Sequence, residues 1–147
     1  MGEVLAVVMR RIVLRAVDWR RMQELVEAGM PLETCGLLAG MGERVSRVIA
    51  VDNIERSPVR FRMEPRAQIQ GLIEIERDGL ELLGIFHSHP TGPSMPSATD
   101  RAEAAYPEAA WLIWSPAGGG WTCRAFSLDR SEPEEIPVVI AEEGTAR

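Results

Sequence analysis

The sequence predicts one α/β domain in which helices flank a central mixed β-sheet. Segments with apolar residues at helical spacing alternate with short β-like segments, which is typical of a domain built around one sheet. Residues 80–89 are apolar at odd and even positions alike, as expected of a strand covered on both faces. The 147 residues, 46% of them hydrophobic, suffice for one core. We therefore expect a single domain over residues 1–141, followed by a frayed tail over residues 142–147.

The first elements are a short strand over residues 12–14 and an amphipathic helix. Asp18 is a candidate cap for this helix, and Gly29 is its expected end. The apolar stripe of the helix comprises Trp19, Met22, Leu25 and Val26. A β-hairpin follows, with a buried strand over residues 34–39, a turn at Gly40-Met41-Gly42 and a second strand over residues 44–51. Glu33 stands at the edge of the first of these strands.

A second helix is predicted after Met63-Glu64-Pro65, because proline suits the first helical turn. Helical spacing continues through Ile69, Leu72, Ile73 and Glu76, up to Gly79. The central strand over residues 80–89 comes next. One face of that strand is expected to carry Leu83, Ile85, His87 and His89, and the other Leu82, Gly84 and Phe86.

The last third of the chain is predicted to hold one more helix and three strands. The helix opens at Ser97-Ala98-Thr99-Asp100 and runs to about residue 105. The strands cover residues 111–114, 122–128 and 136–141. No internal repeat or domain linker interrupts this order.

Charge and cysteine content exclude several classes of protein. A net charge of −6 argues against a nucleic-acid or anionic-membrane partner, because binding to phosphates depends on an excess of Lys and Arg. Cys35 and Cys123 form no disulfide framework and lack the spacing of a thiolate zinc site, so we expect a reducing cytoplasm. Neither a signal peptide nor a run of membrane-spanning length is found in the sequence, so we expect a soluble protein.

The two histidines of the chain, His87 and His89, suggest a metal centre. Residues i and i+2 of a strand project from the same face, so both imidazoles converge on one point. The Pro/Gly loop after them delivers Ser97 and Asp100, and Asp100 could close the site as a third ligand. Hydrolytic zinc usually takes three protein ligands from His and Asp/Glu and leaves a fourth position for water.

Each of these residues also has an ordinary interpretation. Ser97-x-x-Asp100 is a capping box as well, and capping can coexist with metal binding. A lone histidine near a strand end is more often a surface or core group than a ligand, and a glutamate after proline, such as Glu33, is usually solvated. The combination of both histidines, the turn-forming spacer and the Ser/Asp pair favours a metal site.

These residues resemble the JAMM (JAB1/MPN/Mov34) metalloprotease family. Its signature is a distant Glu, then H-x-H, seven residues, Ser, two residues and Asp, and Glu33, His87, His89, Ser97 and Asp100 match every position. The segments Pro31-Leu32-Glu33-Thr34-Cys35-Gly36-Leu37-Leu38 and Phe61-Arg62-Met63-Glu64-Pro65 are similar to the compact prokaryotic members. The resemblance implies an MPN-like domain with a curved sheet, similar to the cytidine deaminase fold.

The resemblance also implies a role for each residue. His87, His89 and Asp100 would bind Zn²⁺ with a water molecule, Glu33 would be the general base, and Ser97 would donate a hydrogen bond to the tetrahedral oxyanion. The implied activity is cleavage of a peptide or isopeptide bond after the C-terminal Gly-Gly of a ubiquitin-like sulfur-carrier protein. The leaving group, whether cysteine, a peptide or a lysine side chain, and the oligomeric state are left open. Cys35 shares strand parity with Glu33, and we expect it to pack rather than react.

Three other classes were compared with this interpretation. A zinc nucleobase deaminase requires H-x-E and P-C-x-x-C, which the chain lacks. A metallo-β-lactamase requires H-x-H-x-D-H, and Pro90 and Gly92 stand in the wrong places for it. A non-catalytic MPN scaffold is the remaining alternative, and the intact ligand set counts against it.

Overall fold

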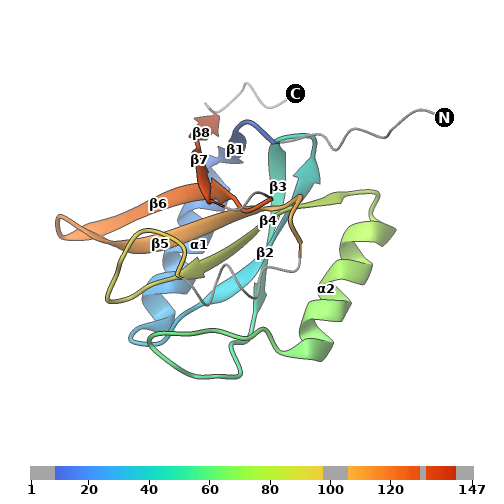
Figure 1. Cartoon of the computed structure of the whole chain (residues 1–147). Helices are drawn as coiled ribbons and strands as arrows, with labels where there is room; N and C mark the ends of the chain where they lie inside the picture. Colours follow the sequence, from blue (N-terminus) through green and yellow to red (C-terminus); the bar gives the residue numbers. More distant parts are fainter. Residues whose placement is uncertain (1–8, 98–105, 130–131, 142–147) are drawn as a thin grey trace.

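The computed structural model describes residues 9–97, 106–129 and 132–141, which form one curved sheet with two helices (Figure 1). The elements are β1 (Ile12–Arg15), α1 (Ala16–Gly29), β2 (Cys35–Met41), β3 (Arg44–Val51), α2 (Pro65–Arg77), β4 (Glu81–Ser88), β5 (Ala110–Ala117), β6 (Gly120–Ser127), β7 (Glu134–Ile136) and β8 (Val138–Ala141). The strand order is β7-β6-β5-β4-β2-β3-β1-β8, with parallel and antiparallel neighbours. The predicted mixed α/β architecture is confirmed.

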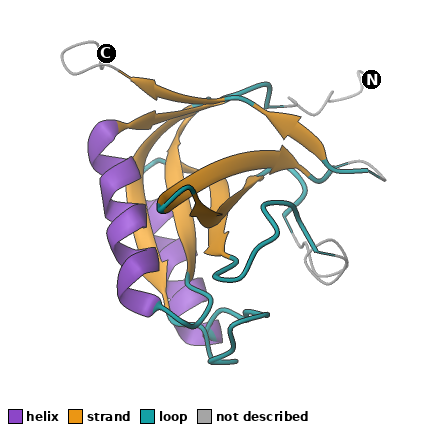
Figure 2. Ribbon diagram, turned by 90° about the vertical axis from the view of Figure 1, so that its left-hand side faces the viewer, coloured by secondary structure: helices purple, strands orange, loops and turns teal. Residues whose placement is uncertain are grey.

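The two margins of the sheet are consecutive in the chain. β7 pairs with β6, β8 pairs with β1, and Pro137 lies between the two strands. The strand predicted over residues 136–141 is therefore wrong as one element, because proline has no N–H to continue a ladder and the chain changes sides there. The carbonyl oxygen of Pro137 accepts a hydrogen bond from the Ile12 N–H at 3.0 Å. The sheet consequently curls towards closure, as Figure 2 shows.

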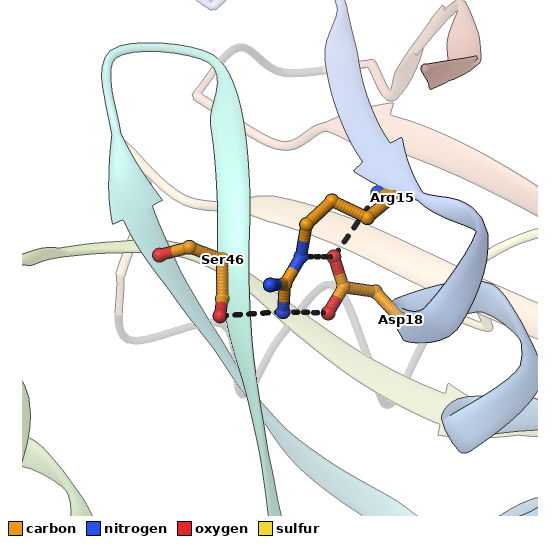
Figure 3. Close-up of polar contacts among 3 residues, drawn as sticks. All are labelled: Arg15, Asp18 and Ser46. Atoms are coloured by element: carbon orange, nitrogen blue, oxygen red, sulfur yellow. Dashed lines mark hydrogen bonds and ion pairs between the residues drawn. The ribbon is translucent and has the colours of Figure 1, made fainter. Parts of the chain in front are cut away.

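The corner between β1 and α1 is fixed by Arg15 and Asp18 (Figure 3). Arg15, rather than Asp18, occupies the N-cap position, so the predicted start of the helix is wrong. Asp18 lies in the first turn, where its carboxylate accepts from the Arg15 N–H at 3.0 Å, from Nε at 2.8 Å and from Nη2 at 2.7 Å. Nη2 also donates to the Ser46 carbonyl oxygen at 2.6 Å, which ties the corner to β3. The apolar stripe is confirmed, since Met22 and Val26 are fully buried.

The predicted hairpin is confirmed as the antiparallel pair β2 and β3. Its turn is shorter than expected, because Gly40 and Met41 belong to β2 and the chain reverses at Gly42, whose φ is +63°. The register shifts next to Gly40, where an added Cβ would overlap the Arg44 carbonyl. Glycine is therefore required at this irregularity.

The central strand is β4, which lies between β2 and β5. Its pairing with β2 shifts by one residue, so Leu83 is an extra residue that faces the same side as Phe86, while Leu82 packs with Ile85. The predicted parity is thus wrong for Leu82 and Leu83, because a bulge reverses the alternation. It holds for Ile85 and His87.

Each face of the sheet has its own core. The face covered by α1 contains Ile12, Leu14, Met22, Val26, Leu38, Phe86, Leu112 and Trp114. The face covered by α2 contains Cys35, Leu37, Ala39, Val51, Met63, Ile75 and Ile85. The second helix begins at Pro65 as predicted, and the Glu64 side chain caps it by accepting from the N–H groups of Arg66 and Ala67. Ile69 and Ile73, by contrast, are more than half exposed.

The C-terminal elements agree with the sequence in part. β5 and β6 confirm the strands predicted over residues 111–114 and 122–128. The helix predicted from Ser97 to about residue 105 falls on residues 98–105, which lie outside the described part of the chain, as does Asp100. Among the described helices, none is long and apolar enough to cross a membrane.

Candidate metal centre

The two histidines meet at the C-terminal end of β4. Both side chains are buried, and their Nε2 atoms lie 3.0 Å apart. This confirms the predicted convergence of His87 and His89 on one point. His87 is the next-to-last residue of β4 and pairs with Cys35 of β2 on one side and with Ile113 of β5 on the other. His87 therefore stands on an interior strand, and His89, directly after it, is held by the hydrogen bond from its N–H to the Trp114 carbonyl oxygen at 2.8 Å.

The His89 ring has a defined tautomer. Its Nδ1 lies 2.7 Å from the carbonyl oxygen of Pro93, and a carbonyl oxygen only accepts, so Nδ1 carries the proton. The other ring nitrogen, Nε2, faces His87 Nε2, and metal-binding histidines typically donate their second N–H to a carbonyl oxygen in this way. The loop that supplies Pro93 is tied to β6, because Arg124 Nη1 donates to the Ser94 hydroxyl at 2.8 Å and the same guanidinium pairs with Glu135 at 2.6 Å.

Aromatic rings hold the His87 imidazole. Phe61, from the loop between β3 and α2, stacks on it with ring centroids 4.5 Å apart and an interplanar angle of 25°. Trp111 of β5 meets it edge-on at 5.1 Å. These two contacts fix the plane of the ring, and they come from segments that the sequence did not associate with the site.

Glu33 is brought to the histidines by main-chain hydrogen bonds. Its side chain is buried, contrary to the ordinary expectation for a glutamate after proline. The next residue, Thr34, donates its N–H to the Ser88 hydroxyl at 2.8 Å and accepts from the Ser88 N–H at 2.9 Å. Ser88 is the middle residue of the H-x-H motif, so this pair of bonds joins the Glu33 loop directly to the histidine strand. Sequence reasoning missed Ser88, because its burial and its hydrogen bonds depend on a partner 54 residues away in the chain.

Glu33, His87 and His89 form a compact set of candidate ligands. One carboxylate oxygen and one nitrogen from each ring all lie within 4.8 Å of one another. Two imidazoles and a carboxylate match the donor types that zinc takes in hydrolytic sites, so the residues present fit that metal. Ser97, the predicted oxyanion donor, is half-buried at the end of the described loop. The position of Asp100, the predicted third ligand, is outside the described residues.

The cysteine next to the site is held in its neutral form. Burial, and then the negative charges of Glu33 and Asp52, raise the pKa of the Cys35 thiol to about 12. Its Sγ donates to the Val51 carbonyl oxygen at 3.3 Å. Burial also raises the pKa of Cys123. A nucleophilic cysteine requires a lowered pKa, so neither thiol suits covalent catalysis.

A cavity of about 610 Å³ adjoins Glu33. Its wall is built by the C-terminal end of α1, the end of β3 and the first residues of the following loop. Leu25, Leu32 and Ile54 make part of this wall apolar, and Asp52 and Glu64 add acidic groups. Glu33 thus borders a space large enough for part of a peptide chain, whereas His87 and His89 are not among the residues that line it.

Comparisons with known proteins identify a family and several relatives. Residues 15–129 match the model of the family described as prokaryotic homologues of the JAB domain. The chain is similar to a probable TtuB-protein conjugate cleaving protease of Thermus thermophilus, with 40% identity over 75% of this chain and 70% of that protein. It is also similar to a desampylase of Pyrococcus furiosus, at 38% identity over 78% and 81% of the two chains. A CysO-cysteine peptidase of Mycobacterium tuberculosis is 32% identical over 71% and 73%.

Solved structures show the same architecture. Protein DSY2949 from Desulfitobacterium hafniense superposes with a TM-score of 0.80 at 33% identity, covering 90% of this chain and 94% of that one. AF2198 from Archaeoglobus fulgidus, a JAB1/MPN domain protein, gives a TM-score of 0.55 at 21% identity, covering 87% and 98%. The second likeness concerns the fold alone, and it agrees with the fold class predicted from the sequence.

Proposed function

The chain belongs to the family of prokaryotic JAB domain homologues and is a hydrolase of peptide or isopeptide bonds. We propose that it works as a zinc-dependent peptidase on ubiquitin-like protein conjugates. The observation that carries this proposal is the meeting of the buried Glu33 carboxylate with the two imidazole nitrogens of His87 and His89. A general base beside a metal-binding pair is what hydrolysis by activated water requires.

The proposed mechanism assigns one task to each residue. His87 and His89, with Asp100, would hold the zinc, which would lower the pKa of a bound water and polarise the scissile carbonyl. Glu33 takes the proton of the attacking water and passes it to the leaving nitrogen as the C–N bond breaks. Ser97 donates a hydrogen bond to the oxygen that becomes negative in between. The products are a carboxylate and an amine, and no covalent enzyme intermediate is needed, which agrees with the neutral Cys35 thiol.

The proposed substrate is a ubiquitin-like sulfur carrier joined through its C-terminal Gly-Gly to another group. The named relatives point in this direction, since their names refer to a TtuB conjugate, to desampylation and to CysO-cysteine. A Gly-Gly tail also suits two buried histidines, because glycine has no side chain to keep the scissile main chain away from them. An extended tail would then bind by main-chain hydrogen bonds beside the site.

The direct test is cleavage of defined carriers. The protein with stoichiometric zinc is incubated with ubiquitin-like sulfur carriers extended at the C-terminus by cysteine, by a peptide or by a lysine-linked partner, and the products are identified by mass spectrometry. We expect cleavage after Gly-Gly in at least one of the three series, and Glu33→Gln is the matched inactive control. The proposal fails if every extended carrier stays intact.

The alternative of a non-catalytic scaffold is decided by metal analysis. A zinc peptidase gains thermal stability when zinc is added, because the metal binds only the folded state. A purified protein that holds no zinc and shows no rise in Tm on its addition would favour the scaffold.

A further inference from the structure

The loop between β3 and α2 is folded around the side chain of Asn53. Its Nδ2 group donates to the carbonyl oxygens of Glu33 and Arg60, each at 3.1 Å. Its Oδ1 atom accepts from the main-chain N–H of Glu55 at 3.0 Å and of Arg62 at 2.9 Å. An asparagine side chain has two N–H donors and an oxygen with two lone pairs, so Asn53 uses its full hydrogen-bonding capacity here.

These four hydrogen bonds differ in how much their loss would destabilise the loop. The bonds to Arg60, Glu55 and Arg62 are exposed, so water replaces them when the side chain is removed. The bond to the Glu33 carbonyl is partly buried. Its loss leaves a polar group with restricted access to water, so the main effect of removing Asn53 falls on Glu33.

The same loop makes two more contacts with the site. The Glu33 N–H donates to the Ser57 carbonyl oxygen at 2.8 Å, so both main-chain groups of Glu33 are held by this loop. Phe61, which stacks on His87, lies between Arg60 and Arg62, and the main chain of both these residues is hydrogen-bonded to the Asn53 side chain. One side chain thus connects the segment that carries Phe61 with the segment that carries Glu33.

We infer that Asn53 is a positioning residue, which holds Glu33 and the loop that carries Phe61 in register with the two histidines. The inference rests on the proposed function, in which Glu33 is the general base. A base must lie within hydrogen-bonding reach of the proton that it removes, and a displacement of about 1 Å costs about 100-fold in rate. Turnover therefore depends on a residue that lies outside the H-x-H motif and acts through the main chain of Glu33.

Three variants separate this role from general support of the loop. Asn53→Asp keeps an acceptor for Glu55 and Arg62 and removes both donated bonds, whereas Asn53→Ala removes all four without adding a charge near Glu33. The matched control is Ser57→Ala. It deletes a hydrogen bond of the same loop, from the Val59 N–H to the Ser57 hydroxyl at 3.1 Å, and retains the carbonyl that accepts from Glu33.

Two measurements test whether Asn53 positions Glu33. On a cleaved carrier, kcat of both Asn53 variants should be at least about tenfold below that of Ser57→Ala, with KM within about threefold and the zinc content equal, because the metal ligands are untouched. In the metal-free protein, hydrogen exchange of the Glu33 amide, followed by NMR, should be at least about tenfold faster in the Asn53 variants than in Ser57→Ala.

Equal Glu33 exchange rates in the Asn53 variants and Ser57→Ala would overturn the inference, and so would equal kcat values. The exchange experiment requires no substrate. If the parent protein cleaves no carrier, the proposed function fails, and the exchange rates still decide whether Asn53 holds Glu33.

Discussion

The two faces of the sheet serve different purposes, and neighbouring residues of β4 show the contrast. Phe86 and His87 are both fully buried, and they point to opposite faces. Phe86 joins the core under α1, with Leu38, Leu112 and Trp114. His87 lies on the α2 side among aromatic rings and next to His89. The comparison teaches that the core of one face supports the backbone that orients the candidate metal ligands on the other.

The first prediction concerns substitutions at the candidate metal centre alone, where we expect the largest effect on turnover. Glu33→Gln should lower kcat by about 1,000-fold while zinc stays bound, because the amide cannot accept the proton. His89→Ala should lose the zinc as well. Steady-state kinetics and metal analysis of both variants check this division of roles, and a Glu33→Gln enzyme with the parent rate would remove the proposed base.

The second prediction concerns the core on the opposite face of the sheet, under α1. Phe86→Ala should lower the free energy of unfolding by about 3–5 kcal/mol, because it removes a fully buried ring from a packed core. Urea denaturation measures the loss. Zinc binding should weaken in parallel with stability, since Phe86 precedes His87 on the strand. A Phe86→Ala protein as stable as the parent would show that the α1 face does not support β4.

The third prediction concerns the loop after His89. Ser97→Ala should reduce kcat by about 100-fold, as expected when one oxyanion donor is removed, with zinc content unchanged. The same kinetic assay and metal analysis apply. A negligible change in rate would limit Ser97 to capping the helix predicted after it.

The fourth prediction tests the corner of α1, which lies away from the candidate metal centre. Asp18→Ala should cost about 1–2 kcal/mol of stability, because three hydrogen bonds from Arg15 are lost and the guanidinium keeps only Ser46. Thermal unfolding provides the measurement, and kcat at a temperature where the variant is folded should match the parent. A large fall in kcat there would show that the two regions are coupled.

The smallest effect is expected at Cys35. Cys35→Ala should keep its zinc and most of its turnover, because the buried thiol is neutral. Its folded pKa is raised to about 12, so the stabilisation from the neutral thiol is complete below about pH 8.5, where the unfolded thiol is also protonated. It is lost as the pH rises towards 12. The Tm of the parent should therefore fall more steeply above pH 8.5 than that of Cys35→Ala, and parallel Tm profiles would contradict the shifted pKa.

Local patterns in the sequence predicted the elements and the pairing of the histidines. The period-two rule placed His87 and His89 on one face, and Pro65 marked the start of α2. The same rule assigned Leu83 to the wrong face, because a bulge depends on the partner strand. Pro137 was predicted to lie inside one strand for a similar reason. Only the pairing of β7 with β6 and of β8 with β1 shows that the chain passes from one edge of the sheet to the other at this residue.

The arrangement around Glu33 could not be predicted from spacing. Ser88 and Asn53 act through hydrogen bonds to main-chain groups 54 and 20 residues away. Any serine or asparagine forms such bonds once the fold has brought the partners together, so their side chains alone carry no signal. Burial of Glu33 follows from these bonds, and its role came from family resemblance instead.

The passage of the chain at Pro137 from one edge of the sheet to the other affects the tendency of the protein to self-associate. The outermost strands are β7, with three residues, and β8, with four, and they follow one another in the chain. A long unpaired edge strand is a template for fibrillar self-association. The edge strands β7 and β8, on either side of Pro137, are too short to serve well as such a template. Within the described part of the chain, these two margins therefore offer few main-chain groups for edge-to-edge pairing with another copy.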